Sequence, residues 1–139
     1  MTRIERVDTA KAKEYVKTLS LPQEEKWAMD YCLTLSLFMW VGLINNRLAC
    51  IWGLIPPTLM SNQAYLWLYT TDVIEGHSFL LVRHSQLVME EMLREYPSIC
   101  GHAIAGSDKS IRWLKWLGAK FGEPQGRGIP FRITRNESA

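Results

Sequence analysis

A strand, a long helix and a second strand follow one another between residues 64 and 105, and this succession constrains the fold most. The run AYLWLYT (64–70) is continuous and rich in aromatic residues, which indicates a buried strand. From Ser78 to Tyr96 apolar residues recur at helical spacing, and Pro97 ends the pattern. The run ICGHAIA (99–105) predicts a further strand. A helix of this length between two strands of one sheet predicts that those strands are parallel.

The rest of the chain predicts antiparallel pairs around that unit. Two strand-like runs, 33–43 and 47–55, flank Asn45-Asn46, a dipeptide that favours a hairpin turn. The segments 119–123 and 129–134 flank PQGRG and predict a second hairpin. The remaining predicted elements are a strand at 2–7, helices at 10–19 and 23–31, and a last helix that starts at Ser107 or Asp108 and ends at Gly118. We therefore expect an α+β fold, with a mixed sheet flanked by helices on both faces, in a single domain spanning 1–139.

The composition argues against several classes of function. Hydrophobic residues make up 47% and charged residues 22%, as in a packed globular protein. The net charge of +2 is scattered along the chain, which argues against a nucleic-acid partner. The longest apolar run, 33–44, is too short to span a bilayer, and no signal peptide is visible, so we expect a soluble protein. Cys32, Cys50 and Cys100 predict buried free thiols in a reducing cytoplasm, and no metal-ligand spacing occurs.

Aromatic residues are numerous enough to raise the alternative of a surface that stacks nucleobases. They alternate within strands or lie on an apolar helix face without interleaved basic residues, so core packing is the better interpretation. The aromatic side chains expected in the core are Trp40, Trp52, Tyr65, Trp67, Tyr69, Trp113 and Trp116.

The element order resembles that of the GNAT acetyltransferases, and one segment carries the resemblance in detail. GNAT enzymes have the pattern Asn-x-x-Ala/Ser-x-x-x-Tyr-x-x-x-Gly-Phe, and this chain has SDKSIRWLKWLGA from Ser107 to Ala119. Ser107 stands where asparagine is usual, and Leu114 stands at the tyrosine position. The run RWLKWLGAKF is also similar to the GNAT-like podovirus proteins of the internal virion protein A family, over residues 33–134.

The resemblance implies a site for acetyl-CoA at the start of the long helix. The first N–H groups of such a helix have no partners within the helix and favour a pyrophosphate. The family's Arg/Gln-x-x-Gly-x-Gly/Ala loop corresponds to residues 72–79, which retain one glycine, while Glu75 brings an unfavourable charge. The residues implied for the cofactor are Tyr69, Thr70, Thr71, Gly76, His77, Ser78, Phe79, Arg83, Ser107 and Ser110.

Two histidines are candidates for the general base toward an amine, because an imidazole titrates near neutral pH. His102 lies on the predicted strand 99–105, and its alternative role is that of a core histidine bonded to the backbone. His77 lies in the loop, and its alternative role is that of a surface residue at the helix start. Arg127, in the second hairpin, is a candidate for selecting an acidic partner.

Two functions follow from the resemblance and stay open. The first is a phage-encoded N-acetyltransferase that binds acetyl-CoA and modifies an amine on a host protein or a small molecule. The second is a GNAT-fold protein without catalysis, acting as a virion component or as a factor that binds a host enzyme. Either would work in the host cytoplasm, with packaging in the virion and a homodimer as further alternatives.

Overall fold

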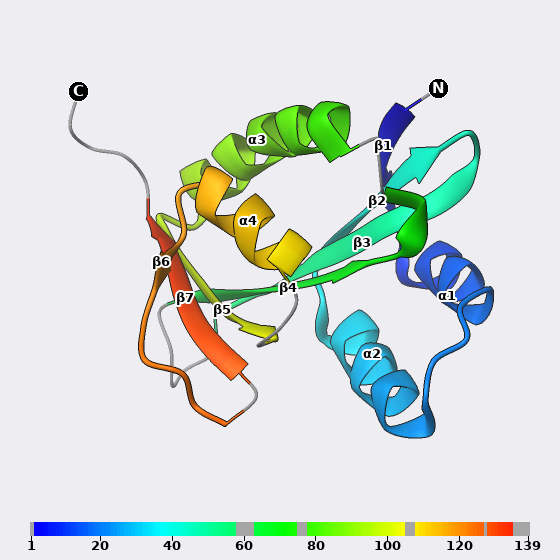
Figure 1. Ribbon diagram of the computed structural model, residues 1–139, viewed down its shortest axis with the longest axis horizontal. Helices are drawn as coiled ribbons and strands as arrows, with labels where there is room; N and C mark the ends of the chain where they lie inside the picture. Colours follow the sequence, from blue (N-terminus) through cyan, green and yellow to red (C-terminus); the bar gives the residue numbers. More distant parts are fainter. Residues whose placement is uncertain (1, 58–62, 75–77, 105–107, 127, 135–139) are drawn as a thin grey trace. The chain divides into compact units, whose positions relative to one another are not determined.

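The computed structural model describes residues 2–57, 63–74, 78–104, 108–126 and 128–134. Within these ranges seven strands form a mixed sheet in the order β1-β2-β3-β4-β5-β7-β6 (Figure 1). Contacts divide the chain into two compact units, Met1–Ile55 with Trp67–Leu81 and Pro56–Leu66 with Val82–Ala139. The strand β4 and the helix α3 each run from one unit into the other. The prediction of a single domain is not tested by this division.

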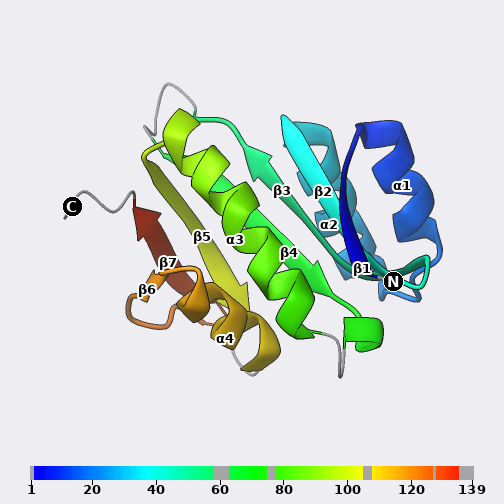
Figure 2. The same cartoon turned by 90° about the horizontal axis from the view of Figure 1, so that it is seen from above.

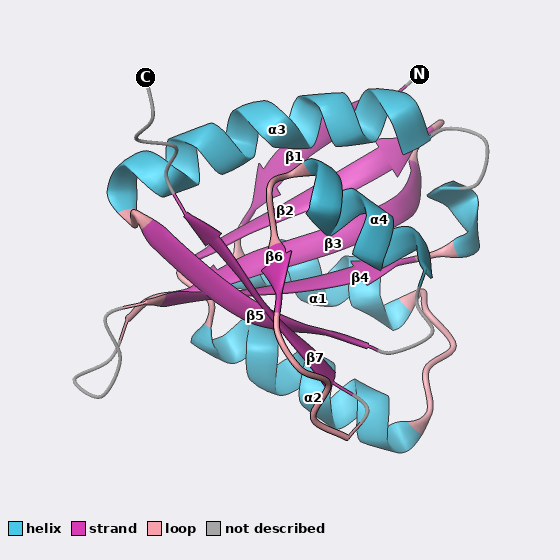
Figure 3. Cartoon of the chain, turned by 60° about the vertical axis from the view of Figure 1, so that its left-hand side comes forward, coloured by secondary structure: helices cyan, strands magenta, loops and turns pink. Residues whose placement is uncertain are grey.

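In the first unit, three antiparallel strands pack against two helices. The elements are β1 (Thr2–Val7), α1 (Thr9–Lys17), α2 (Gln23–Leu35), β2 (Phe38–Ile44), β3 (Arg47–Ile55), the second half of β4 (Ala64–Thr70) and a 3₁₀ turn η1 (Asp72–Ile74). Both helices lie on the same face of β1–β3 (Figure 3). Asp8 caps α1 by accepting a hydrogen bond from the Lys11 amide at 2.8 Å.

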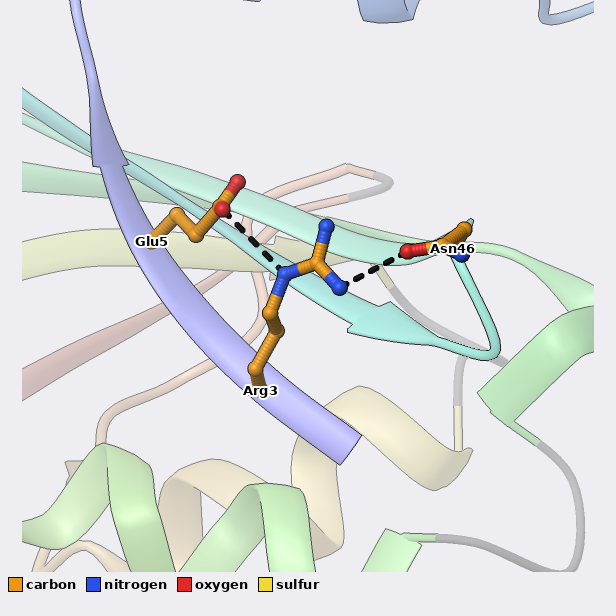
Figure 4. Close-up of polar contacts among 3 residues, drawn as sticks. All are labelled: Arg3, Glu5 and Asn46. Carbon is orange, nitrogen blue, oxygen red and sulfur yellow. Dashed lines mark hydrogen bonds and ion pairs between the residues drawn. The ribbon is translucent and has the colours of Figure 1, made fainter. Parts of the chain in front are cut away.

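The hairpin predicted at Asn45-Asn46 is confirmed. Both residues have positive φ, 51° and 67°, which is the conformation of a two-residue turn with the right twist for the flanking strands. The side chain of Arg3 fastens β1 to this turn (Figure 4). Its guanidinium donates to Asn46 Oδ1 at 2.7 Å and to Glu5 Oε1 at 3.2 Å. The turn that joins β2 to β3 therefore also holds the neighbouring edge strand.

One strand boundary is corrected. Residues 33–35 were expected in a strand, but they form the last turn of α2, and β2 begins only at Phe38. The apolar run fits a strand or a buried helix equally well, and Leu33 packs in the core one turn after Met29. The helix ends at Ser36, whose amide and hydroxyl both donate to the Cys32 carbonyl. Trp67 Nε1 donates in turn to Ser36 Oγ at 2.6 Å, so a distant strand fixes this helix end.

In the second unit, the parallel pairing predicted from the sequence is confirmed. The elements are the first half of β4, α3 (Ser78–Glu95), β5 (Ser98–Ile104), α4 (Asp108–Trp116), β6 (Lys120–Phe121) and β7 (Gly128–Thr134). The strand β5 runs parallel to β4 and antiparallel to β7. Both α3 and α4 lie on one face of β5 and β7 (Figure 2). Gly118, at the predicted end of the last helix, has a φ of 97° and ends α4 in the left-handed conformation.

Burial confirms most, but not all, of the expected core. Trp40 and Trp52 are buried, face each other across the hairpin and stack with centroids 6.1 Å apart. Trp116 is 49% exposed and is the last residue of α4, after the buried Trp113 and Leu114. The expectation that this side chain is part of the core is wrong.

The three cysteines are free, and only Cys50 is buried; the prediction is wrong for Cys32 and Cys100, which are half-buried. Cys50 lies opposite Gly42 in the hairpin, where a Cβ on the glycine would lie 2.5 Å from the Cys50 sulfur. Glycine at this position therefore makes room for the thiol. Burial raises the pKa of the Cys50 thiol from 9.0 to about 12.

We expect Cys50 to resist alkylation in the native protein. A pKa of about 12 instead of 9.0 lowers the thiolate fraction at pH 8 by about a thousandfold, and the thiolate is the reactive form. Iodoacetamide followed by peptide mass spectrometry is expected to modify Cys32 and Cys100 well before Cys50. In urea all three should react at similar rates, and rapid modification of Cys50 in the native protein would contradict the prediction.

Candidate functional site

The side chains of Tyr65 and His102 meet on the surface of the second unit. Tyr65 Oη lies 3.2 Å from His102 Nδ1, and the two rings have centroids 5.9 Å apart. The residues come from parallel neighbours, because β4 pairs with β5 through Ala64–Leu66 and Ile99–Gly101. His102 directly follows the last of these pairs. Both strands continue past this contact, β4 to Thr70 and β5 to Ile104.

The register of β5 decides which way His102 faces. Gly101 and Ala103, its neighbours in sequence, are buried, whereas His102 is exposed. The alternation of a strand therefore places the imidazole on the opposite face. The alternative of a core histidine bonded to the backbone is wrong, since its ring contacts a tyrosine hydroxyl at the surface. The role of His102 as a general base stays a prediction.

The contact with Tyr65 determines what the imidazole can do. When the phenol accepts a hydrogen bond from Nδ1–H, the lone pair of the ring lies on Nε2, which can then accept a proton. When the phenol instead donates to Nδ1, the Nε2–H group is a donor. In both tautomers the hydrogen bond fixes the orientation of the ring. Tyr65 was expected only in the core, and its alignment with His102 depends on the strand register.

In the first unit, Tyr69 lies near the end of β4 and carries a phenol with a perturbed pKa. Burial, and then the negative charges of Glu25 and Asp72, raise the pKa of Tyr69 above its ordinary value. These two carboxylates come from α2 and from η1. The phenol therefore stays protonated at neutral pH and is available as a hydrogen-bond donor. Its assignment to the cofactor site stays a prediction.

Thr71, another residue implied for the cofactor, has its hydroxyl engaged within the fold. Thr71 Oγ1 donates to the Leu48 carbonyl at 2.6 Å and lies 3.3 Å from the Ala49 carbonyl. It also accepts a hydrogen bond from the Val73 amide at 3.3 Å. The hydroxyl thus holds the start of η1 against β3. Thr70 is half-buried at the last position of β4.

Three residues of the loop expected to hold the pyrophosphate, 75–77, lie outside the described residues, and they include Gly76 and His77. The backbone of Ser78 and Phe79 forms the start of α3, as the helical period predicted. Arg83 is exposed near the start of α3. Arg127, proposed for partner selection, is also outside the described residues.

The helix α4 carries the segment that resembles the GNAT pattern. Ser107 is outside the described residues, and Ser110 is buried in the first turns of the helix. Leu114, at the tyrosine position of the pattern, is 2% exposed and packs in the core. Trp113 Nε1 donates to Ser85 Oγ of α3 at 2.7 Å, which joins the two helices. This helix therefore serves packing and contributes no phenol.

Among the described residues, no group of three or more His, Cys, Asp or Glu side chains could hold a metal ion. In the same part of the chain, no helix is both long and apolar enough to cross a membrane.

Three solved structures of acetyltransferases are similar to this chain in fold. An acetyltransferase of the GNAT family from Staphylococcus aureus Mu50 matches with a TM-score of 0.69 and 9% identity, over 96% of this chain and 99% of that one. The ribosomal-protein-S5-alanine acetyltransferase from Vibrio fischeri matches with a TM-score of 0.68 and 12% identity, over 98% and 94%. The putative acetyltransferase yncA from Salmonella typhimurium, solved with acetyl-CoA, matches with a TM-score of 0.65 and 13% identity, over 100% and 96%.

Sequence comparisons give no match to a protein-family model or to a curated protein. The structural matches confirm the expected fold over nearly the whole chain. At these identities they show the fold alone. The narrower similarity to podovirus proteins stays a prediction.

Proposed function

We propose that this chain, which has the GNAT fold, binds acetyl-CoA and transfers the acetyl group to an amine. The contact of the exposed His102 with Tyr65, beside the short stretch where β4 and β5 pair, carries the catalytic part of this proposal. The fold supports the cofactor, since yncA, with the same fold, was solved with acetyl-CoA.

The proposed cofactor contacts centre on the start of α3. The first turn of this helix, from Ser78, presents backbone N–H groups without helical partners to an anion. Arg83 adds a cationic, exposed side chain near that end. The thioester of acetyl-CoA, when bound, supplies an acyl group that is already activated for attack.

The chemistry proposed for the side chains is a single proton transfer. Nε2 of His102 would take the proton that the amine nitrogen gives up on bonding to the acyl carbon, and coenzyme A would leave as a thiol with a proton from water. Tyr65 holds the imidazole by accepting from Nδ1–H, which leaves Nε2 basic. Acyl transfer from a thioester to an amine depends mainly on how the two reactants are positioned. The presence of leucine instead of tyrosine at position 114 is therefore compatible with turnover.

One observation favours a second function. Leu114 is buried at the position where many GNAT enzymes have the tyrosine that protonates the departing thiolate of coenzyme A. In this alternative the chain keeps the fold for interaction with a partner and does not turn over acetyl-CoA. The resemblance to podovirus proteins leads us to propose a phage origin for either function. The acceptor or partner would then be a host protein or another virion protein, met in the host cytoplasm or in the virion.

Calorimetric titration with acetyl-CoA tests the proposal. We expect saturable binding and a rise in the midpoint of thermal unfolding, because a ligand that binds only the folded state stabilises it. NADP⁺ is the matched control, since it carries adenosine phosphates without the pantetheine arm. No heat and no thermal shift at millimolar acetyl-CoA would refute both the cofactor and the transfer.

A charge reversal locates the binding site. Arg83→Glu is expected to weaken acetyl-CoA binding, because the new carboxylate would repel the phosphates. Arg94→Glu, at the other end of α3, is the control, since Arg94 is also exposed and lies three turns away along the helix. Equal effects of the two substitutions would place the phosphates elsewhere.

A further inference from the structure

The helix α2 carries apolar side chains on the side that faces solvent. Trp27 and Tyr31 are each 67% exposed, and Leu35 is 41% exposed. Leu37, two residues beyond the helix, is 55% exposed. These four are among only six large apolar side chains that are exposed in the described part of the chain. An amphipathic helix places polar residues on this side, so the outer face of α2 reverses the usual pattern.

Helical geometry brings the three side chains of α2 into one row. Residues 27, 31 and 35 follow at intervals of four, which places them one above the other on the same face. The side that packs on the first unit is a different one, since Met29 and Leu33 are the buried residues of the helix. Packing within the first unit thus does not require Trp27 or Tyr31. An exposed row of this kind marks an interaction site.

The charges on α2 itself are mostly negative. The helix carries Glu24, Glu25 and Asp30 against a single basic residue, Lys26, so its net charge is −2 in a chain of net charge +2. Glu24 lies one turn before Trp27, and Asp30 lies one turn after it. Asp30 is 66% exposed, and its contact with Lys13 of α1 at 3.9 Å is a weak, solvated ion pair. The apolar row is therefore bordered by carboxylates that remain available to cations.

The same sign of charge continues to the end of β4. Glu25 and Asp72 both act on the Tyr69 phenol, so the first turn of α2 lies near the strand end to which the cofactor is assigned. Two aromatic faces beside carboxylates form a surface suited to ammonium and guanidinium groups through cation–π contacts and charge.

We infer that the outer face of α2, formed by Trp27, Tyr31, Leu35 and Leu37, docks a polypeptide segment that combines apolar residues with lysine or arginine. A second copy of the chain fits this face less well. In an antiparallel contact of two α2 helices, Glu24 and Glu25 of each copy would lie against the uncharged last turns of the other helix and would gain no cation. The docking itself does not depend on the proposed function. Only the further step, in which the docked basic segment accepts the acetyl group, rests on it.

The test uses the full chain and two synthetic peptides. One is an amphipathic helix of leucine and lysine with a blocked N-terminus, and the other has glutamate in place of lysine. We expect the lysine peptide to bind, with an affinity that falls as salt increases, and the glutamate peptide not to bind. Fluorescence anisotropy of labelled peptide measures both affinities in the absence of acetyl-CoA. Failure of the lysine peptide to bind would overturn the inference.

Substitutions locate the contact. Trp27→Ser with Tyr31→Ser is expected to weaken binding of the lysine peptide at least about tenfold, because exposed aromatic side chains are typical anchors of interfaces. The matched control is Leu87→Ser with Trp116→Ser, which removes two other exposed apolar side chains, from α3 and α4. Circular dichroism checks that both variants fold. Equal binding by the two double variants would overturn the inference.

Two further readouts separate the alternatives. Sedimentation measures whether the chain is a dimer. A wild-type dimer that is lost in the Trp27→Ser/Tyr31→Ser variant would show that a second copy binds this face, and it would overturn the inference of a basic partner. Mass spectrometry of the lysine peptide after incubation with acetyl-CoA tests the acceptor role. Docking without acetylation would refute the transfer while leaving the docking surface in place, so the two proposals can fail separately.

Discussion

Replacing Gly101 by alanine is expected to lower the free energy of unfolding by about 3 kcal/mol or more, as a severe overpacking does. A Cβ at this position would lie 2.4 Å from the Leu66 carbonyl oxygen and 2.6 Å from the Phe131 ring. The phenyl ring could turn away, but the carbonyl belongs to the backbone of the paired strand β4. Relief would therefore require the parallel pair itself to move apart.

Urea unfolding followed by tryptophan fluorescence measures the effect of Gly101→Ala. For a chain of this size the loss corresponds to a fall of about 1–2 M in the urea midpoint. The control is Gly128→Ala on the adjacent strand, where the nearest atom to the new Cβ would be 3.6 Å away, an ordinary contact. Similar urea midpoints for the two variants would show that β4 and β5 lie farther apart at Gly101 than they do in the structure.

Removing the imidazole of His102 is expected to have the largest effect on activity. If the amine is acetylated as proposed, His102→Ala should lower kcat about 10²–10⁴-fold, the usual contribution of a general base. Binding of acetyl-CoA should be unchanged, since the base acts on the acceptor. Added imidazole should restore part of the rate, which it would not do if His102 only supported the fold.

Two other substitutions complete this test. His84→Ala is the control, because His84 is an exposed histidine on α3 that has no part in the proposal. Tyr65→Phe should lower kcat less than His102→Ala and leave KM unchanged, because Tyr65 positions the ring without touching the acceptor. A rate for His102→Ala equal to that of His84→Ala would refute the role of His102.

The elements of the fold were predictable where local chemistry settles them. The Asn45-Asn46 turn adopts the positive φ that asparagine tolerates, and the cap at Asp8 and the left-handed Gly118 lie where the residue types indicate. The helical spacing of apolar residues over 78–96 predicted that a helix connects two strands. The parallel pairing of β4 with β5 follows from that connection.

Residues 33–35 show where local patterns are not enough. Alternating apolar and small residues there suit a strand, yet the core accommodates Leu33 beside Met29 of the same helix. The helix then stops where Trp67, more than thirty residues away, donates to Ser36. A residue's neighbours in the sequence do not reveal such a contact.

The strand, long helix and strand between residues 64 and 105 determined that the sheet contains a parallel pair, because a helix that crosses from the end of one strand to the start of the next makes the two strands parallel. The sequence could also nominate His102 and the start of α3. Only the tertiary structure decided that His102 faces solvent and meets Tyr65, because a shift of one residue in strand register would turn that side chain to the other face. The tertiary structure also decided that Trp27 and Tyr31 lie outside the core, because packing against the sheet determines which side of α2 is buried.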